Sequence, residues 1–133
     1  MKDILVPISP GELLDKITIL RIKSARMSDA AKLANVRAEL AELEKTWRVA
    51  VGTTQASVSE DERALQAVNE RLWVIEDDIR DKERAQAFDA RFIELARAVY
   101  IENDERAAIK KRINVKLGSR IVEEKSYKPY KPA

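Results

Sequence analysis

The sequence predicts an all-α protein, an antiparallel bundle of four to five helices. Long segments repeat apolar residues at intervals of three and four, which is the spacing of one helix face. Helix-capping pairs stand before two of these segments, Ser9 with Glu12 and Ser59 with Glu62. Only three glycines and four prolines occur in 133 residues, so few positions interrupt a helix. With 45% hydrophobic and 36% charged residues, the chain has the composition of one folded domain.

The first helix is expected from Pro10 to Met27. Ser9 is a favoured N-cap, and Pro10 suits the first helical position, where its missing N–H has no intrahelical acceptor to lose. Apolar residues cover most of the circumference of this helix rather than one narrow stripe. Such a helix is either central in its own fold or packs against both its core and a partner. On this ground we expect a homo-oligomer.

The second helix follows Ser28 and Asp29, either of which can cap it. Its apolar positions form a coiled-coil-like seam of about 20 residues, which is roughly 30 Å of helix. The seam consists of Leu33, Val36, Leu40, Leu43, Trp47 and Val51. The small polar residues of 51–59 then indicate a loop.

The third helix follows Ser59, which forms a capping box with Glu62. Its seam consists of Leu65, Val68, Leu72, Ile75 and Ile79. Phe88 is out of phase with this seam, so the chain turns between about Glu83 and Phe88, although no cap is evident there. A fourth helix begins near Phe88, and Gly118 is placed to end the last helical stretch in the left-handed conformation.

The two ends of the chain predict short strands. Residues 3–8 (DILVPI) are mostly apolar, although Pro7 confines such a strand to a sheet edge or a strand end. Residues 119–124 (SRIVEE) indicate a second strand, and a two-stranded ladder between the two would close the fold. We therefore predict a single helical domain over 1–125 and a flexible tail over 126–133.

The stretch YIENDERAAIKKRIN (100–114) departs from the helical rhythm. Continuing the apolar stripe of the fourth helix puts Asn103, Arg106 and Lys110 where apolar residues are expected. One interpretation is a helix break at Asn103, which is a good N-cap. Asp104 would then lie in the first turn of a new helix, where negative charge is favoured, and the two cations would lie at the surface.

The alternative is an unbroken helix that turns these side chains inward or into a cleft. A buried cation without a counter-charge is too costly to persist, so each cation needs a carboxylate or an anionic ligand. Asp15, Asp77 and Asp78 are candidate partners on other helices. Both an anion site and an internal or intersubunit salt-bridge network fit this pattern. The candidate binding residues are the polar ladder Asn103, Arg106, Lys110 and Asn114, with Asp104, Asp15 and Lys16.

The composition excludes several kinds of chemistry. Without cysteine there is no thiolate nucleophile or thiolate metal site, and without histidine the usual general base is missing. Three glycines cannot build a glycine-rich phosphate loop. We predict no catalytic residue, no metal and no cofactor. The longest apolar run, residues 4–8, is too short for a membrane span or a signal-peptide core, so we expect a cytoplasmic protein without membrane contact.

Two charged clusters support weaker hypotheses. The acidic residues between Glu76 and Glu83 could hold magnesium as in all-α nucleotide pyrophosphohydrolases, but the second acidic motif of those enzymes is not found. From residue 103 onward, nine Lys/Arg stand against four Asp/Glu, a local charge of +5 in a chain of net charge +2. This basic stretch lacks interleaved aromatic residues and any docking motif, so weak nucleic-acid binding is only a third alternative.

Three long stretches resemble a known family. They are ISPGELLDKITIL (8–20), ARAVYIENDERAAIKKRIN (96–114) and GSRIVEEKSYK (118–128). They resemble a family of short bacterial proteins of similar length with no assigned function, over nearly the whole chain and most weakly across 48–64. The resemblance implies a loose association with glycosyltransferase and surface-polysaccharide contexts and implies no catalytic residue. Arg21 departs from the acidic residue that the family pattern leads us to expect there.

The leading functional hypothesis is a cytoplasmic, non-enzymatic binding or accessory module that uses the polar ladder. Its partners would be a second copy of the chain and either an anionic small molecule or an acidic protein surface. The main alternative is an enzyme that acts on an anionic substrate such as a nucleotide or sugar nucleotide. In that case Arg106 and Lys110 would hold phosphate, and Asp15 or Asp104 would act as base.

Overall fold

The computed structural model describes residues 1–132 and is helical apart from its irregular ends and short turns. Its elements are α1 (Pro10–Arg26), α2 (Ala30–Val51), the 3-10 helix η1 (Gly52–Val58), α3 (Ser59–Arg84) and α4 (Ala90–Lys116). The predicted all-α class is confirmed. None of the helices within residues 1–132 combines the length and the hydropathy that crossing a bilayer requires.

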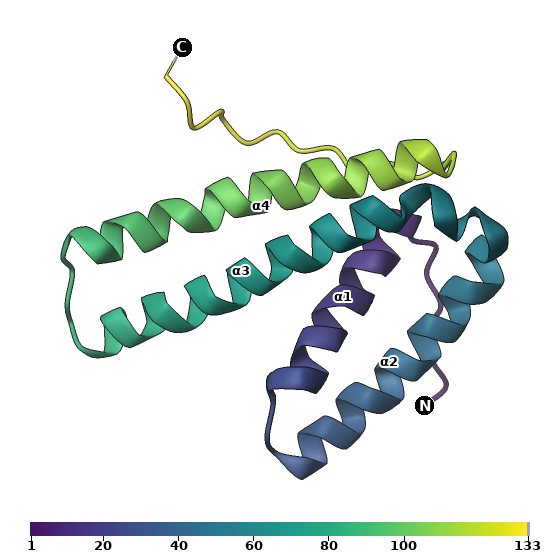
Figure 1. Ribbon diagram of the computed structural model, residues 1–133, viewed down its shortest axis with the longest axis horizontal. Helices are drawn as coiled ribbons and strands as arrows, with labels where there is room; N and C mark the ends of the chain where they lie inside the picture. Colours follow the sequence, from purple (N-terminus) through teal and green to yellow (C-terminus); the bar gives the residue numbers. More distant parts are fainter. Residues whose placement is uncertain (133) are drawn as a thin grey trace.

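The α-helices form two antiparallel hairpins rather than one closed bundle (Figure 1). The hairpin of α1 and α2 and the hairpin of α3 and α4 meet at the η1 end and diverge toward their tips. α1 packs against α2, α3 and α4, whereas α2 packs against α1 and η1. α1 is therefore the central helix. Its broad apolar circumference is explained within one chain, so it no longer supports the predicted homo-oligomer.

The core lies where the two hairpins meet. The largest fully buried apolar side chains come from α1, η1, α3 and α4: Leu14, Ile17, Val58, Leu65, Val68, Ile109 and Ile113. Trp47 of α2 covers one edge of this cluster, and its indole N–H donates a hydrogen bond to Gln55 of η1. Burial of apolar area is thus concentrated at the joint, which is also where α4 lies against the first turns of α1.

Several helix ends follow the predictions. The Ser9 hydroxyl oxygen accepts the amide of Glu12 at 3.2 Å, and Asp29 caps α2. Gly118 has φ +64°, and the amide of Ser119 donates to the carbonyl of Asn114 at 2.8 Å. This 6→1 bond past a left-handed glycine is a Schellman motif, and it satisfies a carbonyl of the last turn of α4.

Two local predictions in the middle of the chain are wrong. Residues 52–58 form η1 rather than a loop, and this helix runs directly into α3. Ser59 therefore lies inside the first turn of α3 and donates to the carbonyl of Gln55, so it does not cap the helix. The cap missed in the sequence is Asp89, whose side chain accepts the amide of Phe92 at the start of α4.

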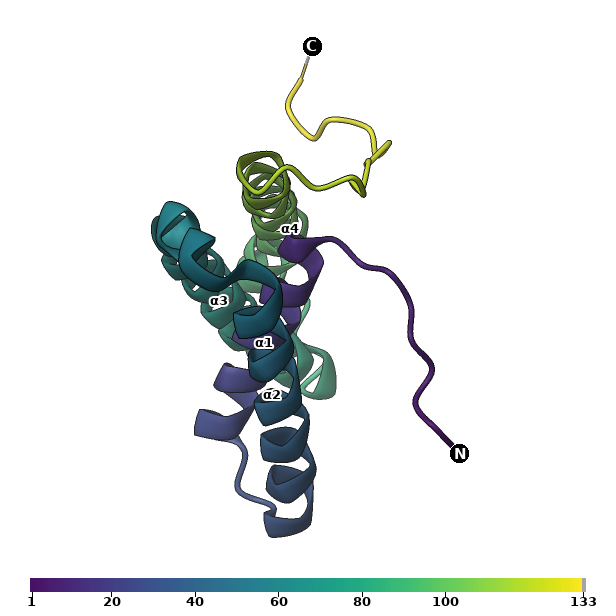
Figure 2. The same cartoon turned by 90° about the vertical axis from the view of Figure 1, so that its right-hand side faces the viewer.

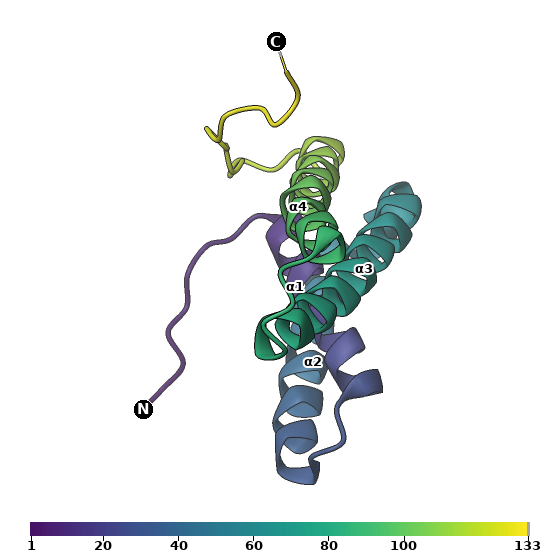
Figure 3. The same ribbon diagram turned by 90° about the vertical axis from the view of Figure 1, so that its left-hand side faces the viewer.

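The predicted pair of strands is also wrong, because within residues 1–132 no strand forms. The segment before α1 extends away from the helices on one side (Figures 2 and 3), while the segment after α4 first runs back along α4 (Figure 1). A lone two-stranded ribbon without a hydrophobic face to cover is only marginally stable in water. The strand propensity of these two segments is therefore not enough to make them pair. The flexible tail predicted over 126–133 stays a prediction, and its last residue lies outside the described residues.

Candidate functional site

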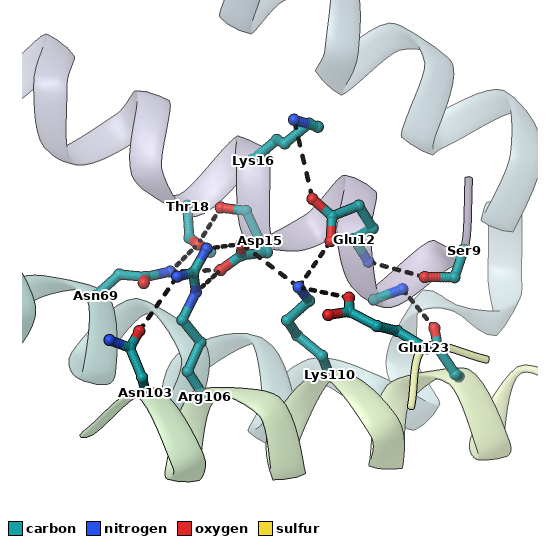
Figure 4. A network of polar contacts seen from close by, with 12 residues as sticks. Ser9, Glu12, Asp15, Lys16, Thr18, Asn69, Asn103, Arg106, Lys110 and Glu123 are labelled. Atoms are coloured by element: carbon teal, nitrogen blue, oxygen red, sulfur yellow. Dashed lines mark hydrogen bonds and ion pairs between the residues drawn. The ribbon is translucent and has the colours of Figure 1, made fainter. Parts of the chain in front are cut away.

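The stretch 100–114 lies inside α4, which continues from Ala90 to Lys116. The predicted helix break at Asn103 is therefore wrong. Asn103, Arg106 and Lys110 lie on the side of α4 that faces α1, and their polar ends point toward it (Figure 4). The helix tolerates polar side chains on this face because α1 supplies counter-charges from buried Asp15 and part-exposed Glu12.

The centre of this face is a two-bonded ion pair between Arg106 and Asp15. Arg106 Nε donates to Asp15 Oδ1 at 2.8 Å, and Arg106 Nη2 donates to Asp15 Oδ2. Asp15 is only 1% exposed, and Asn69 Nδ2 donates both to its Oδ1 and to the Thr18 hydroxyl at 2.9 Å. No buried side-chain nitrogen or oxygen within residues 1–132 lacks a hydrogen-bond partner. The pair is thus fully satisfied inside the chain.

The electrostatics hold Asp15 in its ionised form. Burial alone would raise the pKa of Asp15, but hydrogen bonds from Arg106 and Asn69 offset it, and the pKa lies below the usual 3.8. The bond to Asp15 also raises the pKa of Arg106. A carboxylate with occupied lone pairs and lowered proton affinity is a poor general base. Asp15 therefore fits badly the role of base that the enzyme alternative gives it.

Lys110 lies one turn farther along α4, among three carboxylates. Its Nζ is 2.6 Å from Glu12 Oε2, 3.4 Å from Glu123 Oε2 and 4.0 Å from Asp15 Oδ2. Burial would lower the pKa of Lys110, but the hydrogen bond to Glu12 and the charges around it leave the pKa above 10.5. Lys110 is therefore an ammonium group held at low exposure. The other oxygen of Glu12 lies 3.8 Å from the exposed Lys16.

A close approach of α1 to α4 at Gly11 makes these contacts geometrically accessible. The amide of Gly11 donates to Asn114 Oδ1 at 2.7 Å. This amide belongs to the first turn of α1, where no intrahelical acceptor exists, so buried Asn114 satisfies it. A Cβ at Gly11 would lie 2.5 Å from the Lys110 carbonyl oxygen and 2.8 Å from Asn114 Oδ1. Only glycine fits at this crossing.

A cleft of about 250 Å³ opens beside the network, between the start of α1, the second half of α4 and the segment after α4. Its charged lining residues are Glu12, Arg106, Lys110, Lys111, Glu123 and Lys125. These are four cations and two carboxylates, and the buried Asp15 behind them leaves a local charge of +1. The cleft is therefore mildly positive, with Lys110 at its inner wall.

The structure brings most of the predicted residues together. Asn103 accepts a hydrogen bond from Arg106 at 3.4 Å, and Lys110 lies on the same face of α4. The Asn114 side chain contacts α1 at the backbone amide of Gly11 rather than at Asp15. Lys16 is exposed at the edge, next to Glu12. Asp104 is exposed and does not line the cleft.

Three members of the network were missed by sequence reasoning. Glu12 was assigned only to the helix cap, yet its position three residues before Asp15 puts both carboxylates on one side of α1. Asn69 lies four residues after Leu65 and three before Leu72, on the apolar face of α3, which is a usable signal of a buried polar group. Glu123 lies on an irregular segment and had no such signal. Of the other proposed partners for Arg106, Asp78 lies 3.9 Å from Arg91 instead.

Comparison with known proteins places this chain in a family. A protein-family model described as a family of unknown function (DUF6165) matches residues 4–132. The match covers nearly the whole chain, so the chain belongs to this family, as the resemblance to proteins of unassigned function predicted. No curated protein and no solved structure shows a significant match. The family assigns no role to any residue, and a function has to be argued from the site itself.

Proposed function

We propose that this member of a family of unknown function is a non-enzymatic binding module whose cleft accepts a carboxylate of an acidic protein partner. The observation that carries the proposal is the environment of Lys110. The Lys110 side chain is 14% exposed and lines the cleft, and its ammonium contacts a carboxylate from the irregular segment after α4. That carboxylate, Glu123, is 56% exposed, and its contact is longer than the contact of Lys110 with Glu12.

The three carboxylates around Lys110 are held unequally. Glu12 and Asp15 belong to α1, which is central and packed on all other α-helices. Glu123 belongs to a segment without helix or strand, where local opening costs little free energy. A partner carboxylate that replaces Glu123 leaves the charge around Lys110 unchanged. Exchange therefore avoids the large penalty of leaving a part-buried cation unpaired.

The neighbouring cations favour an acidic peptide over a single small anion. Lys111 lines the same cleft and pairs at 3.3 Å with Glu124, with both side chains largely exposed. Lys125 also lines the cleft. Exposed pairs of this kind contribute little to stability, so their lysines can pair with a partner at low cost. A row of acidic residues would meet three cations in succession, which supplies orientation as well as attraction.

The other functional hypotheses fit the site less well. The enzyme alternative loses Asp15 as a base because its lone pairs are occupied, and Asp104 lies outside the network. Nucleic-acid binding loses phosphate contacts because Arg112 and Lys116 pair with Asp61 at 3.3 and 2.7 Å. A cytoplasmic location stays a prediction.

The proposal is tested by fluorescence anisotropy with a fluorescein-labelled octaglutamate peptide, at low and at moderate salt. Glu123→Gln removes the internal competitor without changing the cleft's size, and we expect it to tighten binding by about fivefold, the effect of one modest ion pair. Lys110→Met should weaken binding by at least as much. Lys45→Met, an exposed lysine of α2, removes the same charge far from the cleft and serves as the control.

The outcomes separate the cleft from simple charge attraction. Equal weakening by Lys110→Met and Lys45→Met would show that net charge, not the cleft, attracts the peptide. Absence of binding to both the parent and Glu123→Gln would contradict the proposal outright. Inorganic phosphate that binds as tightly as the peptide would point instead to a small-anion site.

A further inference from the structure

The segment before α1 exposes a continuous apolar run. Ile4, Leu5 and Val6 are 80%, 91% and 65% exposed. The segment extends from the start of α1 into solvent, away from the helices (Figures 2 and 3). Scattered exposed apolar side chains are ordinary, but three in succession with most of their surface exposed are typical of a segment that binds another apolar surface.

The same chain carries an apolar groove beside the root of this segment. The groove measures about 700 Å³, within the range of about 300–1,000 Å³ typical of sites that accept a ligand. Leu13 and Trp47 line it from α1 and α2, and Leu117 lines it from the end of α4. Ile8 and Pro10 form part of its rim. The groove and the apolar segment are therefore neighbours in the fold.

We propose that residues 4–6 of one chain dock in this groove of a second copy, and that the exchange is reciprocal. The segment leaves the rim at Ile8 and runs away from the helices, so within one chain it does not lie in its own groove (Figures 2 and 3). Pro7 keeps Val6 extended, so the segment projects beyond the rim. A second copy can therefore receive it, and reciprocal exchange about a two-fold axis closes the assembly as a dimer.

The surface area that this exchange would bury is in the range of a weak to ordinary dimer interface. Burying an aliphatic side chain of this size removes roughly 60–120 Å² of apolar surface from water, by the relation between area and transfer free energy. Three side chains from each of two segments, together with the groove walls that they cover, bury roughly 700–1,400 Å² on that basis. A specific interface needs about 1,000 Å² or more. The upper half of this range reaches that size without any further contact between the helices.

Disulfide trapping tests the proposal cleanly, because the chain contains no cysteine. Leu5→Cys chains are mixed with Ala50→Cys chains, oxidised mildly and analysed on a non-reducing gel; Ala50 is an exposed residue of the groove wall. We expect a covalent dimer that contains one chain of each kind. A mixture of Leu5→Cys with Val74→Cys, an exposed valine of α3 outside the groove, should give none.

The mass in solution provides the second measurement. The parent should run as a dimer in light scattering at micromolar concentration, and Leu5→Asp should halve its mass. Val74→Asp, with the same change in charge and polarity, should leave the mass unchanged. Circular dichroism should show the same helix content for all three, since neither residue is buried.

Each contrary result overturns the proposal. A monomeric parent without mixed cross-links would show that no second copy occupies the groove. Cross-linking within one chain carrying both Leu5→Cys and Ala50→Cys would show that the segment folds back. Cross-linking of Leu5→Cys chains only to each other would show that the segments pair together instead. None of these substitutions touches the Lys110 cleft, so failure here leaves the proposed function standing.

Discussion

Replacement of Arg106 by methionine tests whether the Arg106–Asp15 pair is a structural element, because it leaves Asp15 buried with less compensation. Removing one partner of a buried ion pair costs about 3–5 kcal/mol of unfolding free energy. Asp15 would keep its bond from Asn69 and the Lys110 charge at 4.0 Å, and Arg106 is itself 29% exposed. The expected loss is therefore at the lower end, about 3 kcal/mol. An unfolding entropy of about 2.1 cal/mol/K per residue converts this into a fall in Tm of roughly 10 °C.

The assay is thermal and urea unfolding followed by circular dichroism. Arg71→Met is the matched control, because Arg71 pairs with Glu102 and Glu105 at 3.0 and 3.2 Å but lies at the surface of the α3–α4 hairpin. Its loss should change the unfolding free energy by no more than about 1 kcal/mol. Equal effects of the two substitutions would refute the reasoning. If Arg106→Met were more stable than the parent, the protein would be keeping this cation at a cost in stability. That result would favour an anion-binding site at Arg106.

A second variant and the pH dependence identify the buried charge as the cause. Adding Asp15→Asn to Arg106→Met removes the stranded carboxylate and should recover part of the lost stability. Without Arg106, burial is the dominant influence on Asp15, so its pKa rises relative to the parent. On acidification, Asp15 takes up a proton in the variant before it does so in the parent. The difference in unfolding free energy between the parent and Arg106→Met should therefore become smaller as the pH falls.

Two further predictions concern the frame around this pair. Gly11→Ala should lower the unfolding free energy by about 1–3 kcal/mol in the same assay, because its Cβ would meet the Lys110 carbonyl oxygen at 2.5 Å and α1 must move away from α4; a neutral effect would refute the close crossing. The parent should keep its full stability above about pH 4 and lose it as the pH falls further. Burial raises the pKa values of Asp15 and Asp61, but hydrogen bonds and charged partners outweigh it and hold both values below 3.8. In urea unfolding measured across pH, Asp15→Asn should lose less stability on acidification than the parent.

The helices could be predicted because their signals are local. Ser9, Asp29 and Gly118 act at the positions where the sequence puts them, since a cap or a left-handed terminator needs only neighbouring backbone groups. Strands need a partner that the sequence does not name. Residues 3–8 have strand composition but no available edge to pair with, so they stay extended and unpaired.

The site could be predicted only in part. Helical spacing places Asn103, Arg106, Lys110 and Asn114 on one face, and in the structure Arg106, Lys110 and Asn114 all bond to α1, with Asn103 beside Arg106. Whether that face turned inward or the helix broke was not decidable locally, because Asn103 suits both a cap and a helix interior that has a partner. The deciding contact joins Arg106 to Asp15, which lies 91 residues earlier in the chain. A glycine at position 11 then lets the two helices approach closely enough for the side chains to meet.

The polar face of α4 divides into two parts with different consequences for function. Asp15, Asn69 and Arg106 satisfy one another, so a ligand there would have to break bonds that already hold three helices together. Lys110 instead shares its charge with Glu123, a half-exposed residue on an irregular segment. Substitution in the first part should therefore appear as lost stability, and substitution of Glu123 as altered binding at nearly constant stability. A stability change from Arg106→Met together with a binding change from Glu123→Gln, and not the reverse, is the pattern that this division requires.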